Sequence, residues 1–176
     1  MPDVVSPDKR RQMMAGIRGR DTQPEFTVRR GLYRAGYRYV LHRRDLPGRP
    51  DIVLPKYRLA VLVHGCFWHR HPNCQLSATP ATRADFWSRK FEANIERDRK
   101  STAALVDAGW RVAIVWECGI RNDPQGMIEW LAEVVRGHHE GVVEWPAQGR
   151  GQTQTRSPDA ESEVSGRRPR QGRRPR

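Results

Sequence analysis

The sequence of 176 residues is poor in cysteine and in long apolar segments. It has no apolar run long enough to cross a membrane, and its first residues lack the apolar core of a secretory signal. We therefore expect a cytoplasmic protein that is not bound to a membrane. The three cysteines are Cys66, Cys74 and Cys118. An odd number of thiols argues against a disulfide framework and leaves metal binding as their alternative use.

Acidic residues are also few, at 20 against 32 basic residues, so the net charge is +12 and the isoelectric point is near 10.7. Arginine makes up 28 of the 32 basic residues. This excess favours a polyanionic partner, and arginine suits bidentate contacts with phosphates and base edges. The alternative is a genome rich in G and C, which raises the arginine content of every protein. We expect a nucleic-acid-binding protein that works in the nucleoid.

The pattern of apolar residues predicts an α/β domain with a mixed central sheet flanked by helices. A capping box of Thr22 and Glu25, with a glycine at position 36, marks the first helix. Strands are expected at residues 37–41, 51–54, 59–63 and 110–116, and further helices at residues 80–108 and 127–135.

Composition divides the chain into three parts. Residues 1–20 form a basic arm, in which Met14 and Ile17 lie among lysines and arginines, and residues 21–145 form the folded domain. Residues 146–176 hold no aromatic side chain and carry eight arginines against three acids. This tail cannot bury enough surface to offset its ordering entropy, so we predict that it is disordered. It either adds non-specific affinity for phosphates or is inert.

One segment, V-L-V-H-G-C-F-W-H-R-H-P-N-C, combines thiols, imidazoles and aromatic rings. Its Cys66, His71 and Cys74 are close enough in sequence to share one ion, and Cys118, after a predicted strand, can complete a Cys₃His set. Such a set is typical of structural zinc that is closed to water. The alternative is reduced core cysteines beside a surface histidine. Proline and asparagine at positions 72 and 73 make the loop too polar for that alternative.

Asp51 opens a predicted strand behind Pro50, where a carboxylate can project from the end of the sheet. It suits a hard, oxygen-preferring ion such as Mg²⁺, although a turn-capping role is the simpler alternative. His64 and His69 lie on either side of Cys66. Because His69 is not needed for the zinc set, it is free to act as a general base near neutral pH.

Asp98 falls in phase with the apolar residues of the long predicted helix, and a buried acid needs a partner. An imidazole partner would give an Asp–His pair that fixes the tautomer of the base. The neighbouring Arg97 or Arg99 would instead give an ion pair. The sequence leaves these two alternatives equal.

Phe67 and Trp68 stand between the predicted metal ligands in a polar loop. Such residues ordinarily belong to a core. In this setting they can form a wedge that enters between base pairs, as in architectural DNA-binding proteins. Met14 and Ile17 of the basic arm could form a second wedge.

These residues lie in segments that resemble the very-short-patch mismatch repair endonucleases, the Vsr family. The similar segments are K-R-R-Q-M-M-A-G-I-R-G-R-D-T-Q-P-E, L-P-G-R-P-D, H-G-C-F-W-H, P-A-T-R-A-D-F-W, N-I-E-R-D-R and G-W-R-V-A-I-V-W-E-C. The resemblance implies an endonuclease domain over residues 21–145 with a type II restriction endonuclease-like core. It also implies nicking of double-stranded DNA on the 5′ side of the T in a T:G mismatch, the product of deaminated 5-methylcytosine.

Carried over to this chain, the resemblance makes Asp51 the Mg²⁺ ligand, helped by the backbone carbonyl of Val63. Some members of the family carry a threonine where Val63 stands, so a side-chain role there is lost. The expected reaction is in-line attack of a metal-activated water on phosphorus, with Mg²⁺ stabilising the charge of the transition state. The products would be 3′-hydroxyl and 5′-phosphate ends.

The resemblance also makes His69 the base that deprotonates the water and Asp98 its orienter. His64 and Glu25 would support the metal-bound waters and the phosphate, although the capping box explains Glu25 equally well. The family varies in length beyond His69, so the choice of His71 for zinc rests on spacing. The implied wedge is Phe67, Trp68 and Met14, and the implied zinc ligands are Cys66, His71, Cys74 and Cys118.

Two alternatives remain at this point. A zinc-containing module that binds distorted DNA without cutting it would leave Asp51, His69 and Asp98 without a role. A restriction-type nicking nuclease of the same fold would leave the wedge without one. Since a nick in one strand needs only one active site, we expect a monomer, with mismatch-repair proteins as further partners.

Overall fold

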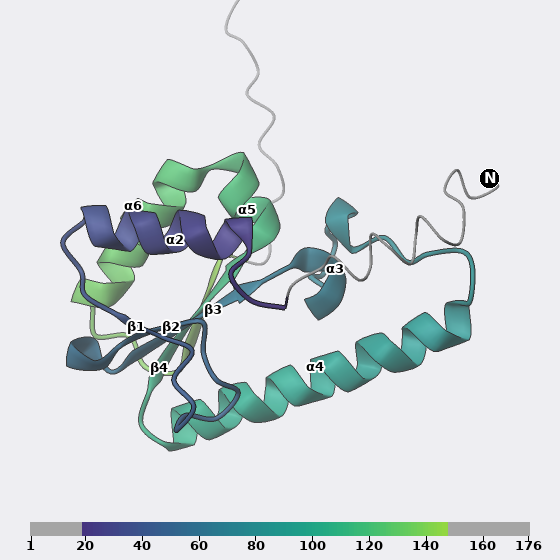
Figure 1. The fold of residues 1–176 in the computed structure, drawn as a ribbon, viewed down its shortest axis with the longest axis horizontal. Helices are drawn as coiled ribbons and strands as arrows, with labels where there is room; N and C mark the ends of the chain where they lie inside the picture. The colour runs from purple at the N-terminus through teal and green to yellow at the C-terminus, as the bar shows by residue number, and fades with distance from the viewer. Residues whose placement is uncertain (1–18, 148–176) are drawn as a thin grey trace, which may run out of the picture.

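The computed structural model describes residues 19–147, which form a five-stranded sheet with helices on both faces (Figure 1). The strands are β1 (Val40–Leu41), β2 (Ile52–Leu54), β3 (Leu59–His64), β4 (Arg111–Trp116) and β5 (Val142–Trp145). The helices are α2 (Gln23–Arg34), α3 (Cys66–His69), α4 (Ala84–Asp107), α5 (Glu117–Asn122) and α6 (Pro124–Arg136), with short 3-10 turns at Pro55–Tyr57 and Gln75–Ser77. This architecture confirms the predicted mixed central sheet flanked by helices.

Two parts of the predicted organisation lie outside the described residues. They are most of the basic arm, including Met14, and the tail from residue 148 onward. Among residues 19–147, no helix is both long enough and apolar enough to span a lipid bilayer.

The sheet is antiparallel on one side and parallel on the other. Its strand order is β1-β2-β3-β4-β5, with β1, β2 and β3 antiparallel and β3, β4 and β5 parallel. The carboxyl ends of β3 and β4 therefore meet at one edge, where His64 pairs with Trp116. The start of β2 reaches the same edge, because Ile52 pairs with Val61. The candidate site residues Asp51 and His64 lie at this edge.

Both faces of the central strands are buried, which explains their nearly continuous apolar sequences. On β3, Leu59 and Val61 pack with α2, α5 and α6, whereas Ala60 and Leu62 pack in a second core cluster with Leu105 of α4. Each strand thus supplies alternate side chains to the two layers. The sheet is fixed from both sides, and the ends of its strands have a rigid base.

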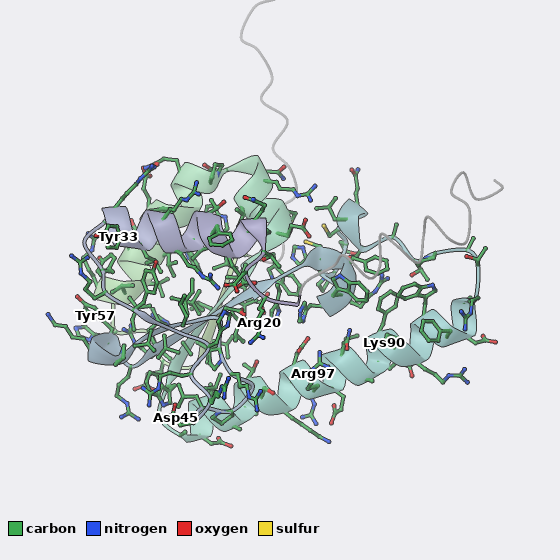
Figure 2. The ribbon with its side chains drawn as sticks, viewed as in Figure 1. Arg20, Tyr33, Asp45, Tyr57, Lys90 and Arg97 are labelled. Carbon is green, nitrogen blue, oxygen red and sulfur yellow. The ribbon has the colours of Figure 1, made fainter. Side chains whose placement is uncertain are left out.

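Helix α4 is longer than the sheet is wide. Its C-terminal part packs on the sheet, and its N-terminal part extends beyond the sheet and runs beside α3 (Figure 1). Exposed basic side chains, including Lys90 and Arg97, lie along this helix (Figure 2). The α3–α4 pair therefore forms an extension of the molecule next to the edge where β3 and β4 end.

Several element boundaries differ from the predicted ones. The strand expected at residues 37–41 is shortened to β1, since only Val40 and Leu41 pair with β2. The side-chain hydroxyls of Tyr37 and Tyr39 donate to the carbonyls of Ala132 and Arg29. Helix α4 begins only after Arg83, whose positive φ of 58° breaks the helix there. The short elements α3, α5 and β5 were not predicted, since each is too brief to show a period.

Candidate active site and metal centre

Asp51 stands at the start of β2 and reaches across to β3. Its Oδ2 accepts a hydrogen bond from the backbone N–H of Val63 at 2.8 Å. Among the described residues, its other oxygen has no hydrogen-bond donor. Burial raises the pKa of Asp51 to about 6, in spite of the Val63 N–H, and the nearby Glu25 raises it further. A carboxylate with one free oxygen and a raised pKa is well suited to meet a cation.

Glu25 lies beside Asp51 and is itself 3% exposed. One of its oxygens accepts from the Thr22 N–H at 3.3 Å and from the Thr22 hydroxyl at 3.0 Å, which closes the capping box of α2. The other accepts from the Asp21 N–H at 3.1 Å and from Arg29 at 2.5 Å. Glu25 therefore caps α2 and lies close to Asp51 at the same time.

Arg29 and His42, which lie around Glu25 and Asp51, were not predicted from the sequence as part of the site. The Arg29 guanidinium, 5% exposed, binds Glu25 and also Asp21 at 2.7 Å, and lies 3.1 Å from Nε2 of His42. The backbone N–H of His42 bonds to the Asp51 carbonyl at 3.3 Å. Arg29 follows Glu25 by four residues on the same helix, which is a sequence signal for an ion pair. Nothing in the sequence indicates that His42 joins them.

The imidazole side of the site lies at the end of β3 and on α3. His64 and His69 are stacked, with ring centroids 4.0 Å apart and an interplanar angle of 5°. Nδ1 of His69 is 2.5 Å from Oδ2 of Asp98 on α4, whereas Arg97 lies 3.8 Å from that carboxylate. Of the two partners considered for Asp98, the structure brings the histidine into hydrogen-bond contact and leaves the arginine at the margin of an ion pair.

The environment of these groups sets their charges. Burial lowers the pKa of His64 to about 3, so its ring is neutral at physiological pH. Burial alone would raise the pKa of Asp98, but the hydrogen bond and charge of His69 hold it below its usual range. Asp98 is therefore an ionised acceptor, and His69 can donate its Nδ1–H to it and keep Nε2 free as a base.

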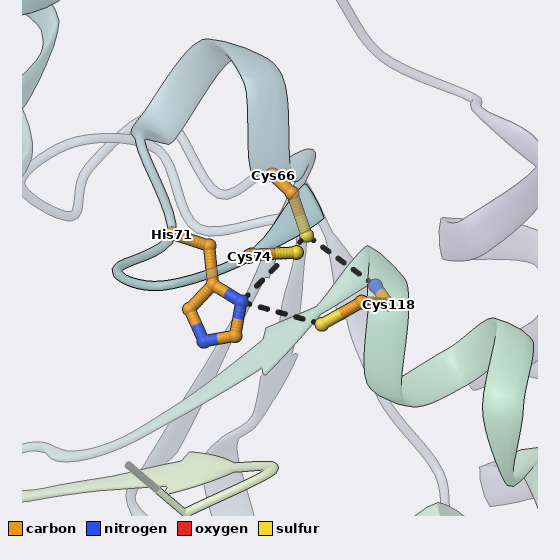
Figure 3. A group of neighbouring side chains, drawn as sticks. All are labelled: Cys66, His71, Cys74 and Cys118. Atoms are coloured by element: carbon orange, nitrogen blue, oxygen red, sulfur yellow. Dashed lines mark hydrogen bonds between the residues drawn. The ribbon is translucent and has the colours of Figure 1, made fainter. Parts of the chain in front are cut away.

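The predicted metal ligands converge at the other end of α3. Figure 3 shows the three thiols and the His71 ring turned toward a common point between α3 and α5. Nδ1 of His71 lies 3.9 Å from Sγ of Cys66 and 3.3 Å from Sγ of Cys118, and the ligand atoms, with that of Cys74, all lie within 4.8 Å of one another. His71, and not His69, is thus the imidazole among the thiols.

This donor set fits a tetrahedral zinc ion. Four ligands about 2.3 Å from such an ion lie about 3.8 Å apart, which is close to the separations seen here. Burial raises the pKa of the thiols of Cys66 and Cys118, so both are protonated without a cation nearby. Binding of zinc would release those protons and tie α3 to the start of α5.

An aromatic cluster covers the extension formed by α3 and α4. The ring of Phe67 packs edge-on against Trp68, Trp87 and Phe91, with centroids 5.0, 5.3 and 5.2 Å away. Next to them, Phe86 is 43% exposed. Trp87 was not predicted as a site residue, because a tryptophan in a long helix is typical of a hydrophobic core. Its place beside Phe67 and Trp68 makes it a third candidate for the wedge.

Similar proteins of known family show to which family this chain belongs. The family model described as DNA mismatch endonuclease Vsr matches residues 2–76. A relative from Xanthomonas oryzae pv. oryzae, the type II nicking enzyme V.XorIIP, is 52% identical over 122 residues, which cover 69% of this chain and 89% of the relative. The chain belongs to the Vsr family.

Two further relatives of this Vsr-family chain agree with the assignment. The DNA mismatch endonuclease Vsr of Escherichia coli is 42% identical over 133 residues, which cover 76% of this chain and 85% of that protein. The type II nicking enzyme V.NmeAIP of Neisseria meningitidis is 40% identical over 122 residues, or 69% of this chain and 86% of its own length. The resemblance drawn from the sequence motifs is confirmed.

Proposed function

We propose that this chain is a Mg²⁺-dependent endonuclease that nicks double-stranded DNA on the 5′ side of the T in a T:G mismatch left by deamination of 5-methylcytosine. Its core would be of the type II restriction endonuclease kind, and it would act as a monomer in the nucleoid. The observation that carries the proposal is the meeting of Asp51, the His69–Asp98 pair and the α3–α4 aromatic cluster at one edge of the sheet.

The acidic side of the site would hold the cation. Asp51 offers a free oxygen, and the backbone carbonyl of Val63, on the strand it touches, is the second proposed ligand. When bound, Mg²⁺ would stabilise the negative charge that develops on the phosphate during in-line attack. Glu25, held ready by Arg29 and the capping box, would orient water near the ion.

The imidazole side would move the proton. His69, with its Nδ1–H donated to Asp98, can take a proton from the attacking water through Nε2. Asp98 fixes the tautomer and stabilises the positive charge that His69 gains. His64, which burial keeps neutral, can donate a hydrogen bond to the phosphate without competing for the proton.

The proposed zinc site supports this chemistry without taking part in it. The side chains of Cys66, His71, Cys74 and Cys118 would fill all four coordination positions of the ion, so that none stays open for water or substrate. Because α3 runs from Cys66 to His69, a fixed Cys66 also fixes the base and the aromatic pair between them.

Mismatch selection would come from the aromatic cluster. Phe67, Trp68 and Trp87, together with Met14 of the basic arm, are proposed to enter the base stack. Unstacking a paired step costs a few kcal/mol, and a T:G wobble unstacks more easily than a Watson–Crick pair. The exposed arginines and lysines around the site would bind the phosphates on either side.

A second candidate function is nicking within a restriction–modification system, because five relatives are named type II nicking enzymes. It would use the same phosphodiester chemistry but would depend on a defined sequence around the target. The two candidates differ in whether a fully paired duplex is cut.

The test is strand cleavage of end-labelled duplexes that are identical except for a T:G, T:A or C:G pair, first in Mg²⁺ and then in EDTA. Nicking only in Mg²⁺, only 5′ to the mismatched T, is the expected result. Equal cutting of paired duplexes would favour the second candidate, and binding without cutting would contradict both.

A further inference from the structure

Trp116 lies between the metal centre and the active-site histidines, and neither site as described gives it a role. It ends β4, is 5% exposed, and pairs in the parallel register with His64 at the end of β3. Cys118, a proposed zinc ligand, follows two residues later in the same turn of chain. Trp116 is therefore tied by backbone to one site and by strand pairing to the other.

The indole ring touches both groups. His71 stacks on it, with centroids 4.3 Å apart and planes 18° from parallel. His64 meets it edge-on, at 5.1 Å and 74°. Since His64 in turn stacks on His69, a continuous set of ring contacts leads from a zinc ligand to the proposed base.

His64 depends on these ring contacts for its orientation. Its Nδ1 is buried and has no hydrogen-bond partner within residues 19–147. Trp116, by contrast, is held firmly, because its indole N–H donates to Oε2 of Glu144 on β5 at 3.0 Å. The fixed indole can therefore set the angle of the unanchored imidazole.

We propose that Trp116 is a positioning residue. By contacting both His71 of the proposed metal centre and His64, it fixes the orientation of the His64–His69 pair and so keeps His69 against Asp98. Removing the indole would leave a cavity into which His64 and His69 can turn. A displacement of about 1 Å at a reacting group can slow a reaction about 100-fold. The proposal rests on the proposed function for its kinetic consequence but not for its structural one.

The test compares Trp116→Leu with Trp110→Leu. Trp110 provides a matched control, because it packs against the same core cluster as Trp116 but precedes the other end of β4, where its ring contacts Arg43 and Arg58. For Trp116→Leu we expect zinc content and affinity for a T:G duplex within about twofold of wild type, and single-turnover nicking about 30- to 100-fold slower. Trp110→Leu should stay within about threefold. Trp116→Phe keeps a ring but loses the N–H donated to Glu144, so it should slow nicking about three- to tenfold.

A second readout does not depend on activity. The short hydrogen bond between His69 and Asp98 should give a far-downfield proton signal in NMR spectra of the zinc-loaded protein. We expect the signal in wild type and in Trp110→Leu, and its loss in Trp116→Leu. Glu144→Ala, which frees the indole N–H without opening the core, should weaken the signal and slow nicking about three- to tenfold, and it decides the question if Trp116→Leu does not fold.

Two results would overturn the proposal. One is a wild-type signal and nicking rate in both Trp116→Leu and Glu144→Ala. The other is loss of zinc in proportion to loss of rate, which would make Trp116 a support of the metal centre alone. If wild type itself does not nick a T:G duplex, the proposed function fails, while the NMR signal and zinc content still test the positioning role.

Discussion

On the acidic side of the site, Glu25 is held by several hydrogen bonds and an ion pair. On the imidazole side, His64 is held by ring contacts and His69 by a single short hydrogen bond. The acidic side is built on α2 and on β2, which is a strand of the sheet itself. On the imidazole side His64 ends β3, but His69 lies on α3 and Asp98 on α4, outside the sheet (Figure 1).

This difference suits the two tasks. A cation site needs carboxylates whose positions do not change when charge arrives, and hydrogen-bonded anchors supply that rigidity. The proposed base, His69, is oriented by its hydrogen bond to Asp98 and by its stacking on His64. If zinc fixes α3 as proposed, the imidazole side depends more on the proposed metal centre than the acidic side does.

The largest expected effect is on the acidic side. Asp51→Asn should remove the cation site and lower nicking at least about 1000-fold, while affinity for a T:G duplex stays within about twofold. Single-turnover cleavage and gel-shift titration of the same duplex measure the two quantities. Nicking near the wild-type rate would mean that the cation binds elsewhere.

A smaller loss is expected when the imidazole side is disturbed through its hydrogen bond. Asp98→Asn should keep the shape of the side chain but remove the charge that stabilises His69, so single-turnover nicking should fall about 100-fold. Asp107→Asn, at the far end of the same helix, is the matched control and should nick as wild type does. Equal rates for the two variants would show that Asp98 has no part in the reaction.

Acid pH should weaken cation binding on the acidic side. The folded pKa of Asp51 is raised to about 6, so the carboxylate is ionised above that pH and becomes protonated as the pH falls through it. Because Mg²⁺ binds the ionised form, the Mg²⁺ concentration that half-saturates nicking should rise about tenfold between pH 7 and pH 5. A half-saturating concentration that does not change over this range would contradict the assignment of Asp51.

The smallest effect should follow from shortening the anchor of Glu25. Arg29→Lys keeps the positive charge but cannot reach both Glu25 and Asp21 in the same way, because an ammonium lacks the planar fork of guanidinium. We expect nicking to fall about three- to tenfold, with a higher half-saturating Mg²⁺ concentration. Arg30→Lys on the exposed side of α2 is the control, and an equal effect of the two substitutions would show that the loss does not depend on the contacts of Arg29 with Glu25 and Asp21.

The sequence allowed the central strands and the capped helix α2 to be predicted, because burial and capping leave local patterns. It could not reveal α3 or β5, since four residues are too few to show a period. The convergence of Cys66, His71, Cys74 and Cys118 was predicted from their spacing. Arg29, His42, Trp87 and Trp116 were missed because their significance lies in the neighbours that the fold brings to them.

The partner of Asp98 could not be predicted from the sequence. Its phase in the helix predicted a partner but could not choose between His69, on a distant segment, and the adjacent Arg97. The choice depends on how α3 packs on α4, and this packing is fixed by long-range contacts such as the bond from the Asn94 amide to the Trp68 carbonyl at 3.0 Å. Only the folded structure contains that information.

The most direct test of the two-sided site uses a T:G duplex in which sulfur replaces one non-bridging oxygen of the phosphate 5′ to the mismatched T. If the cation held by Asp51 contacts that phosphate, the sulfur diastereomer facing it should be nicked at least about 30-fold more slowly than the oxygen substrate in Mg²⁺. Mn²⁺, a softer ion, should largely restore the rate. An equal effect of sulfur in Mg²⁺ and Mn²⁺, for both diastereomers, would contradict a cation at Asp51 acting on the scissile phosphate.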